Sequence, residues 1–150
     1  MIYTVTGAGP RTGTSWTMEQ LEKAGLPIYY TEYVKIPGAG YETMQDELAA
    51  LKNVIVKVWP NSMFMNKISR MVVLKRDYAS QLASLEVQIE REREAGFTVN
   101  MPAEQMIEQA KWVLQQSTIP RLEVETQDLD NRIGEIIDWL SEPFEQVRTA

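Results

Sequence analysis

The residues of this chain that could do chemistry gather near its N-terminus, in the glycine-rich segment 7–16, which reads GAGPRTGTSW. An apolar run precedes this segment, and a helical pattern follows it through Leu21. A strand that opens through such a turn into a helix aims backbone N–H groups and the positive helix end at one point. The hydroxyls and the Arg11 guanidinium add side-chain donors. The segment therefore predicts an anion site suited to a phosphate.

Spacing separates this segment from two better-known phosphate motifs. If Gly13 and Ser15 are aligned with the second glycine and the hydroxyl of the nucleoside triphosphatase motif, Thr14 stands where that motif needs lysine. The dinucleotide fingerprint fails as well, because Thr12 occupies its third glycine position. A strand-to-helix turn rich in capping residues, without a ligand, is the remaining alternative.

A second set of polar residues follows another apolar run. Residues 71–75 read MVVLK and predict a buried strand, Arg76 and Asp77 come directly after it, and Ser84 lies eight positions beyond Arg76. A helix rises about 1.5 Å per residue, so a serine two turns into a helix that starts here still faces the strand end. Arg76 and Ser84 are therefore expected to share one site.

Taken together, these motifs resemble those of the sulfotransferase family. Segment 10–16 (PRTGTSW) is similar to the family's 5'-phosphosulfate loop, and Arg76 with Ser84 matches the spacing of its 3'-phosphate contacts. Segment 54–60 (VIVKVWP) resembles the family's third strand, in which Lys57 matches a characteristic lysine. Trp59 stands where the vertebrate cytosolic enzymes carry a catalytic histidine.

The resemblance implies a single P-loop domain over residues 1–150, a three-layer α/β/α fold related to P-loop nucleoside triphosphatases. Its parallel sheet would hold about five strands, near residues 2, 28, 54, 71 and 121, in the order 2-3-1-4-5. The alternation of strand and helix patterns independently favours a parallel sheet with right-handed crossovers. Helices are expected over residues 14–23, 42–52, 77–95 and 102–116, with a last apolar helical stripe over 129–140.

The resemblance also implies an activity: transfer of a sulfuryl group from 3'-phosphoadenosine 5'-phosphosulfate to a hydroxyl or amine acceptor. Lys57 would offset charge on the bridging oxygen, and Arg76 and Ser84 would hold the 3'-phosphate. The residues that would hold the 5'-phosphosulfate are Arg11, Thr12, Gly13, Thr14 and Ser15.

The catalytic base has to be a group other than histidine, because the chain contains no histidine. Glu42 is the candidate, since Gly40-Tyr41-Glu42 is similar to a segment of bacterial relatives; Glu32 is the reserve. Glu42 can equally be read as an acid in a first helical turn, where it favours the helix dipole.

Two other functions stay open at this point. A noncatalytic nucleotide-binding or scaffold relative would explain Trp59, the missing histidine and the lack of the Arg-Lys-Gly loop that closes over the nucleotide in the cytosolic branch. A P-loop nucleotide or small-molecule kinase is the other alternative, against which the missing lysine argues.

Composition restricts partners and location. The 150 residues, 44% of them hydrophobic, suffice for one core, and the net charge of -6 argues against a nucleic-acid surface. Without cysteine or histidine, no metal site is expected. No apolar run approaches the roughly twenty residues of a membrane span, so we expect a cytoplasmic protein without membrane contact. The apolar region 63–71 and the Trp-bearing helices could provide the interface of a homo-oligomer.

Overall fold

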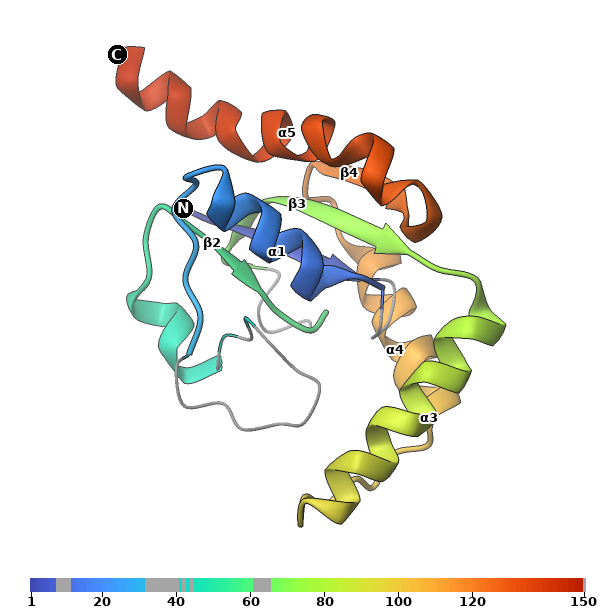
Figure 1. Ribbon diagram of the computed structural model, residues 1–150. Helices are drawn as coiled ribbons and strands as arrows, with labels where there is room; N and C mark the ends of the chain where they lie inside the picture. Colours follow the sequence, from blue (N-terminus) through green and yellow to red (C-terminus); the bar gives the residue numbers. More distant parts are fainter. Residues whose placement is uncertain (8–11, 32–40, 42, 44, 61–65, 150) are drawn as a thin grey trace.

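A parallel sheet forms the centre of the protein, whose computed structural model describes residues 1–7, 12–31, 41, 43, 45–60 and 66–149 (Figure 1). Within these residues the sheet has four strands in the order β2-β1-β3-β4. The strands are β1 (Ile2–Gly7), β2 (Val54–Lys57), β3 (Ile68–Lys75) and β4 (Arg121–Glu125). All neighbouring pairs run parallel, so the expected α/β class is confirmed.

The fifth strand expected near residue 28 is wrong for the described residues, and the strand count and order therefore differ from 2-3-1-4-5. That segment forms one isolated parallel bridge, between Ile28 and Ile55. Tyr29 N donates to Ile55 O at 3.0 Å, and Ile55 N donates to Pro27 O at 2.9 Å. Because Pro27 has no N–H, the ladder cannot extend through it as a regular strand would.

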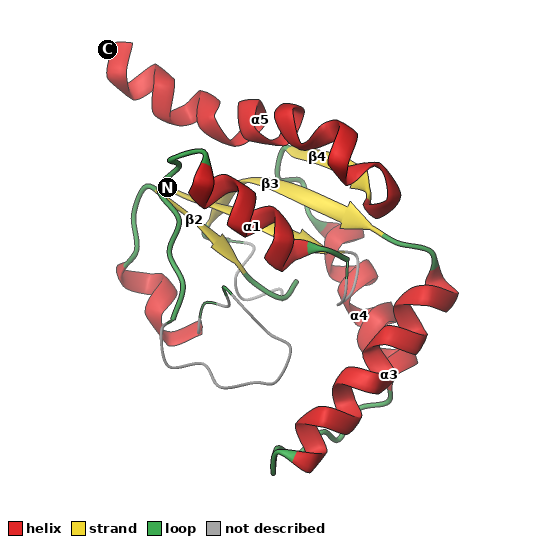
Figure 2. Ribbon diagram, viewed as in Figure 1, coloured by secondary structure: helices red, strands yellow, loops and turns green. Residues whose placement is uncertain are grey.

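Helices follow β1, β3 and β4 along the chain (Figure 2). The elements in order are α1 (Thr14–Lys23), the 3-10 helix η1 (Gln45–Ala50), α3 (Tyr78–Glu94), α4 (Ala103–Gln116), the 3-10 helix η2 (Thr126–Asp128) and α5 (Leu129–Thr149). The expected helices over 14–23, 77–95 and 102–116 are confirmed to within one residue at each end. The expected helix over 42–52 is wrong for the described residues of that range, where the 3-10 helix η1 ends at Ala50 and no α-helix forms. Thr43 instead donates its N–H to Lys57 O at 3.2 Å and its hydroxyl to Tyr29 O at 3.1 Å, which holds it against β2.

Each face of the sheet is covered by a different set of helices. Helices α1 and α5 lie over one face, where Val5, Met18 and Ile136 are fully buried (Figure 1). On the other face, Leu48 of η1 and Leu114 of α4 pack with residues of β1, β2 and β3. Helix α3 projects beyond the sheet and packs on the N-terminal part of α4, where the two helices share a small apolar cluster (Figure 2). Parallel pairing brings the carboxyl ends of all four strands to one edge, where ligands of such sheets bind.

Candidate functional site

The turn between β1 and α1 is built on Gly13, the residue that precedes the helix. Gly13 has a φ of 97°, in the left-handed region that glycine enters without steric cost. Its carbonyl oxygen accepts from Thr17 N at 3.1 Å and from Thr17 Oγ1 at 2.9 Å, which starts the helix. A Cβ at this position would lie 2.8 Å from Leu129 Cδ1 of α5. Glycine is therefore required here for its conformation and for its small size.

The structure brings Lys57 and Ser15 together. Lys57 ends β2, which pairs with β1 through Val5 and Lys57, and Ser15 lies in the first turn of α1. Lys57 Nζ donates to Ser15 Oγ at 2.9 Å. An ammonium group thus stands at the positive end of α1, among the first N–H groups of the helix, and this combination favours a bound anion.

Thr12 and Thr14 are the other described residues of the predicted loop. Thr12 is buried, and its Oγ1 has no hydrogen-bond partner among the described residues. The carbonyl oxygen of Thr12 accepts from Thr126 Oγ1 at 2.6 Å. A buried hydroxyl without a partner is costly, so an oxygen-rich ligand would stabilise this position. Thr14 is the first residue of α1 and is half-buried.

Arg76 connects β3 to α3 and lies beside the cap of that helix. The Asp77 carboxylate accepts from Ser80 N at 2.9 Å. This backbone hydrogen bond, with smaller contributions from the Ser80 side chain and from the charge of Arg76, holds the pKa of Asp77 below its ordinary value of 3.8. Asp77 therefore stays ionised and fixes where α3 begins.

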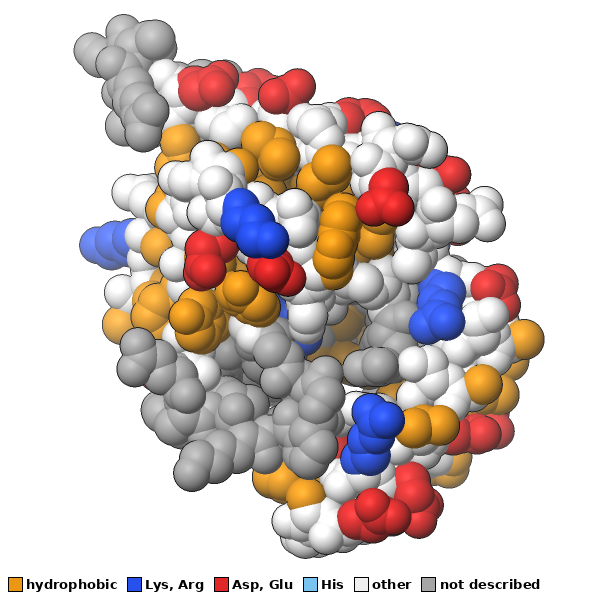
Figure 3. Space-filling view, in the orientation of Figure 1, with side chains coloured by type: hydrophobic (Ala, Val, Ile, Leu, Met, Phe, Trp, Pro, Cys, Tyr) orange, Lys and Arg blue, Asp and Glu red, His pale blue; other side chains and the backbone are white. Residues whose placement is uncertain are grey.

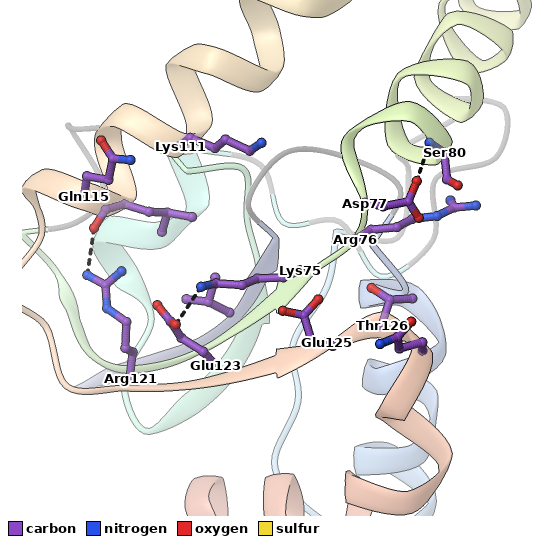
Figure 4. A pocket seen from close by; sticks show the side chains of 13 residues that line it. Lys75, Arg76, Asp77, Ser80, Lys111, Gln115, Arg121, Glu123, Glu125 and Thr126 are labelled. Atoms are coloured by element: carbon purple, nitrogen blue, oxygen red, sulfur yellow. Dashed lines mark hydrogen bonds and ion pairs between the residues drawn. The ribbon is translucent and has the colours of Figure 1, made fainter.

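A pocket of about 690 Å³ opens beside Arg76, between α4, the carboxyl half of β3 and the length of β4 (Figure 4). From the described residues, Ser80 of α3 lines this pocket together with Arg76. Ser84 lies one turn further along α3 and is half-buried. The pocket lining includes Ser80 and not Ser84, so the structure does not bring the expected Ser84 to this pocket together with Arg76.

Several residues of the pocket carry no motif in the sequence. They are Lys111 and Gln115 of α4, Arg121, Glu123 and Glu125 of β4, and Thr126 and Gln127 beyond it. Glu125 ends β4 and Thr126 follows it, so the rule that ligands bind at the carboxyl ends of parallel strands could have found both. Lys111 offers no such signal, because only the return of α4 against the sheet brings it here.

The remaining predicted site residues, Arg11 and Glu42, lie outside the described residues, as does the reserve base Glu32. Thr43, next to Glu42 in the sequence, contacts the carbonyl oxygen of Lys57. On the face shown in Figure 3, Lys and Arg side chains alternate with Asp and Glu and form no broad basic area. In the described part of the chain, no helix combines the length and apolar character needed to cross a membrane.

Comparison of the chain with models of known protein families gives no match, and comparison with curated proteins gives none either.

Proposed function

We propose that this protein is a small sulfotransferase that binds 3'-phosphoadenosine 5'-phosphosulfate and passes its sulfuryl group to a hydroxyl or amine. The observation that carries the proposal is the 2.9 Å contact between Lys57 Nζ and Ser15 Oγ. This contact places the ammonium group of Lys57, from β2, at the N-terminus of α1, the helix that follows the Gly13 turn. That arrangement suits a phosphosulfate. In the nucleoside triphosphatase motif the lysine belongs to the loop, whereas here Lys57 of β2 brings an ammonium group to the same end of the helix.

The reaction needs charge stabilisation more than covalent chemistry. The acceptor oxygen or nitrogen forms a bond to sulfur, while the bond between sulfur and the bridging oxygen breaks and its electron pair leaves with the adenosine 3',5'-bisphosphate. The acceptor proton goes to a base, for which Glu42 is our candidate. Lys57 would stabilise the negative charge that grows on the bridging oxygen, an effect that acts mainly in the transition state.

The rest of the donor would be held at two places. Arg11, Thr12, Gly13, Thr14 and Ser15 would surround the 5'-phosphosulfate. The buried hydroxyl of Thr12, which has no hydrogen-bond partner in the described part of the chain, supports this assignment, because a ligand oxygen would satisfy it. Arg76 and Ser84 would hold the 3'-phosphate, and the position of Arg76 at a pocket wall supports its part.

Isothermal titration with adenosine 3',5'-bisphosphate tests the donor site. Arg76→Ala should weaken binding by about tenfold or more, because a charge-assisted contact contributes about 1.5–3 kcal/mol. Arg91→Ala is the matched control, since Arg91 is exposed near the other end of α3. Equal affinities of wild type and Arg76→Ala would overturn the assignment.

A thermal-shift comparison separates this proposal from a kinase. The bisphosphate should raise the melting temperature at concentrations where ATP with magnesium does not, because a ligand stabilises the state that binds it. Stabilisation by ATP with magnesium alone would favour the kinase. Tight bisphosphate binding without transfer to any hydroxyl or amine acceptor would instead favour a noncatalytic relative.

A further inference from the structure

One peptide group of the β1–α1 turn is held from outside the turn. Thr126 Oγ1 donates to the carbonyl oxygen of Thr12 at 2.6 Å. Thr126 lies where β4 ends, beside the start of α1 (Figure 4). The peptide between Thr12 and Gly13 is trans and planar, so its C=O and N–H groups point in opposite directions. Because the carbonyl of Thr12 is directed at Thr126, the N–H of Gly13 is directed away from it.

The next peptide group is held by the helix itself. The carbonyl oxygen of Gly13 accepts from Thr17 N at 3.1 Å and from Thr17 Oγ1 at 2.9 Å. By the same planarity, the N–H of Thr14 points out of the N-terminal end of α1. Within the part of the chain that the structure describes, neither Gly13 N nor Thr14 N has a backbone acceptor. Such N–H groups need an acceptor from outside the helix.

The backbone conformation turns these two N–H groups toward one place. Gly13 is left-handed, with a φ of 97° and a ψ of 18°, and Thr14 begins the right-handed helix. Successive residues of opposite hand form a concavity of N–H groups that binds anions. The ammonium of Lys57, which contacts Ser15 Oγ at 2.9 Å, adds positive charge at the same end of α1. The buried Thr12 hydroxyl, without a hydrogen-bond partner among the described residues, adds a further polar group.

Glycine at position 13 makes the direction of its own N–H depend on what holds the Thr12 carbonyl. Glycine enters left-handed and right-handed conformations about equally well, so the peptide before it can rotate with little steric resistance. The hydrogen bond from Thr126 opposes that rotation. Packing acts in the same direction, because a Cβ on Gly13 would stand 2.8 Å from Leu129 Cδ1 and 3.7 Å from Thr126 Cγ2. The segment after β4 therefore lies directly against the turn.

We propose that Thr126 is a positioning residue of the donor site: by holding the Thr12 carbonyl, it aims the N–H of Gly13 at the anionic 5'-group of the donor. This inference rests on the proposed function. Thr126 acts through Thr12 rather than on the ligand, since its hydroxyl hydrogen is donated to the Thr12 carbonyl. A backbone N–H that donates to an ionised oxygen forms one of the stronger hydrogen bonds in proteins, so its direction should affect affinity.

The test compares two ligands that differ only in the 5'-phosphate: adenosine 3',5'-bisphosphate, titrated directly, and adenosine 3'-monophosphate, titrated by displacement of the bisphosphate. Thr126→Val keeps the shape of the side chain but cannot donate. It should weaken bisphosphate binding by about fivefold or more and change monophosphate binding by less than about twofold. Thr126→Ser keeps the hydroxyl and should bind the bisphosphate as wild type does. Thr118→Val is the matched control, because Thr118 is exposed between α4 and β4.

Amide NMR spectra observe the Gly13 N–H directly. The bisphosphate should move the Gly13 amide proton of wild type downfield, as a hydrogen bond to a phosphate oxygen does, and should move it less in Thr126→Val. Titrations and spectra are recorded well below the melting temperature of each variant, so that a loss of binding is not a loss of folding.

The outcomes distinguish the two proposals. Failure of wild type to bind the bisphosphate would overturn both. If wild type binds it, an unchanged affinity in Thr126→Val, or an equal loss for the two ligands, would overturn the role of Thr126 and leave the sulfotransferase proposal standing. Failure of Thr126→Ser to retain bisphosphate binding would also overturn that role, because the serine hydroxyl can still donate to Thr12.

Discussion

Thr126 Oγ1 donates a hydrogen bond of 2.6 Å to the carbonyl oxygen of Thr12, across 114 positions of sequence. Thr126 begins η2 directly after β4, and Thr12 precedes the glycine that starts α1. Thr126 also lines the pocket that holds Arg76 and Lys111. The bond therefore joins the β1–α1 turn to the pocket wall, so the two parts of the proposed donor site share a support.

Removal of this bond should destabilise the protein. Thr126→Val keeps the shape of the side chain but leaves the Thr12 carbonyl without this donor, which should lower the free energy of unfolding by about 1 kcal/mol. Urea denaturation measures the change. Thr118→Val is the control, because Thr118 is exposed between α4 and β4. Equal losses in the two variants would contradict a structural role for the bond.

Gly13→Ala should destabilise the protein by more than the usual cost of a positive φ. The left-handed conformation alone costs an L-residue about 1–2 kcal/mol, and the new Cβ would also stand 2.8 Å from Leu129 Cδ1. Gly25→Ala isolates the first effect, since Gly25 has a φ of 83° and open space around it. Thermal melts should rank Gly13→Ala below Gly25→Ala, and a reversed order would exclude the contact with Leu129.

Gly134→Ala should raise the free energy of unfolding, in contrast to Gly13→Ala. Gly134 lies inside α5, and a Cβ there would have nothing within 4 Å. Alanine loses less conformational freedom in a helix, so the substitution should stabilise the protein by about 0.5–1 kcal/mol. The free energy of unfolding in urea measures this directly, and a loss of stability would show that the helix is constrained at this position.

Sequence patterns predicted the elements whose signals are local. The first helix begins at Thr14 and the long helices end near Gly96 and Gln116, because caps and apolar spacing act over a few residues. The strand near residue 28 was wrong for a local reason, because Pro27 has no N–H to continue the ladder, whereas the helix over 42–52 was wrong for a non-local reason. Contacts of Thr43 with β2 override its helical pattern, as tertiary contacts commonly do.

The same distinction applies to the candidate site. Lys57 ends β2 and Arg76 directly follows β3, and a strand-end rule is sufficient to place both at one edge of the parallel sheet. The contact between Lys57 and Ser15 depends on side-chain reach, and the presence of Lys111 depends on how α4 returns to the sheet. Neither the Lys57–Ser15 contact nor the place of Lys111 at the pocket corresponds to a periodic pattern or a fixed residue spacing, so sequence reasoning could not have found them.

Lys57→Met should lower kcat for sulfuryl transfer by about 100-fold or more and change bisphosphate affinity much less. The reason is that the ammonium is proposed to stabilise charge that develops on the bridging oxygen in the transition state, and loss of one such donor typically costs this much. Single-turnover transfer and titration separate the two effects. Lys52→Met, at an exposed position before β2, is the control. A loss confined to affinity would assign Lys57 to ground-state binding instead.

Asp77 should make folding depend on acidic pH. Its pKa is lowered in the folded protein, mainly by the hydrogen bond from Ser80 N, so its contribution to stability is present above the unfolded value of 3.8 and is lost as pH falls through the folded value. Asp77→Asn keeps a good helix cap but cannot titrate. The free energies of unfolding of the two proteins should therefore differ most near neutral pH and converge below pH 3.8, as urea denaturation at several pH values would measure. If the difference in the free energy of unfolding stayed constant through this pH range, the charge of Asp77 would contribute nothing to the stability of the start of α3. The position of Arg76 would then depend on β3 alone.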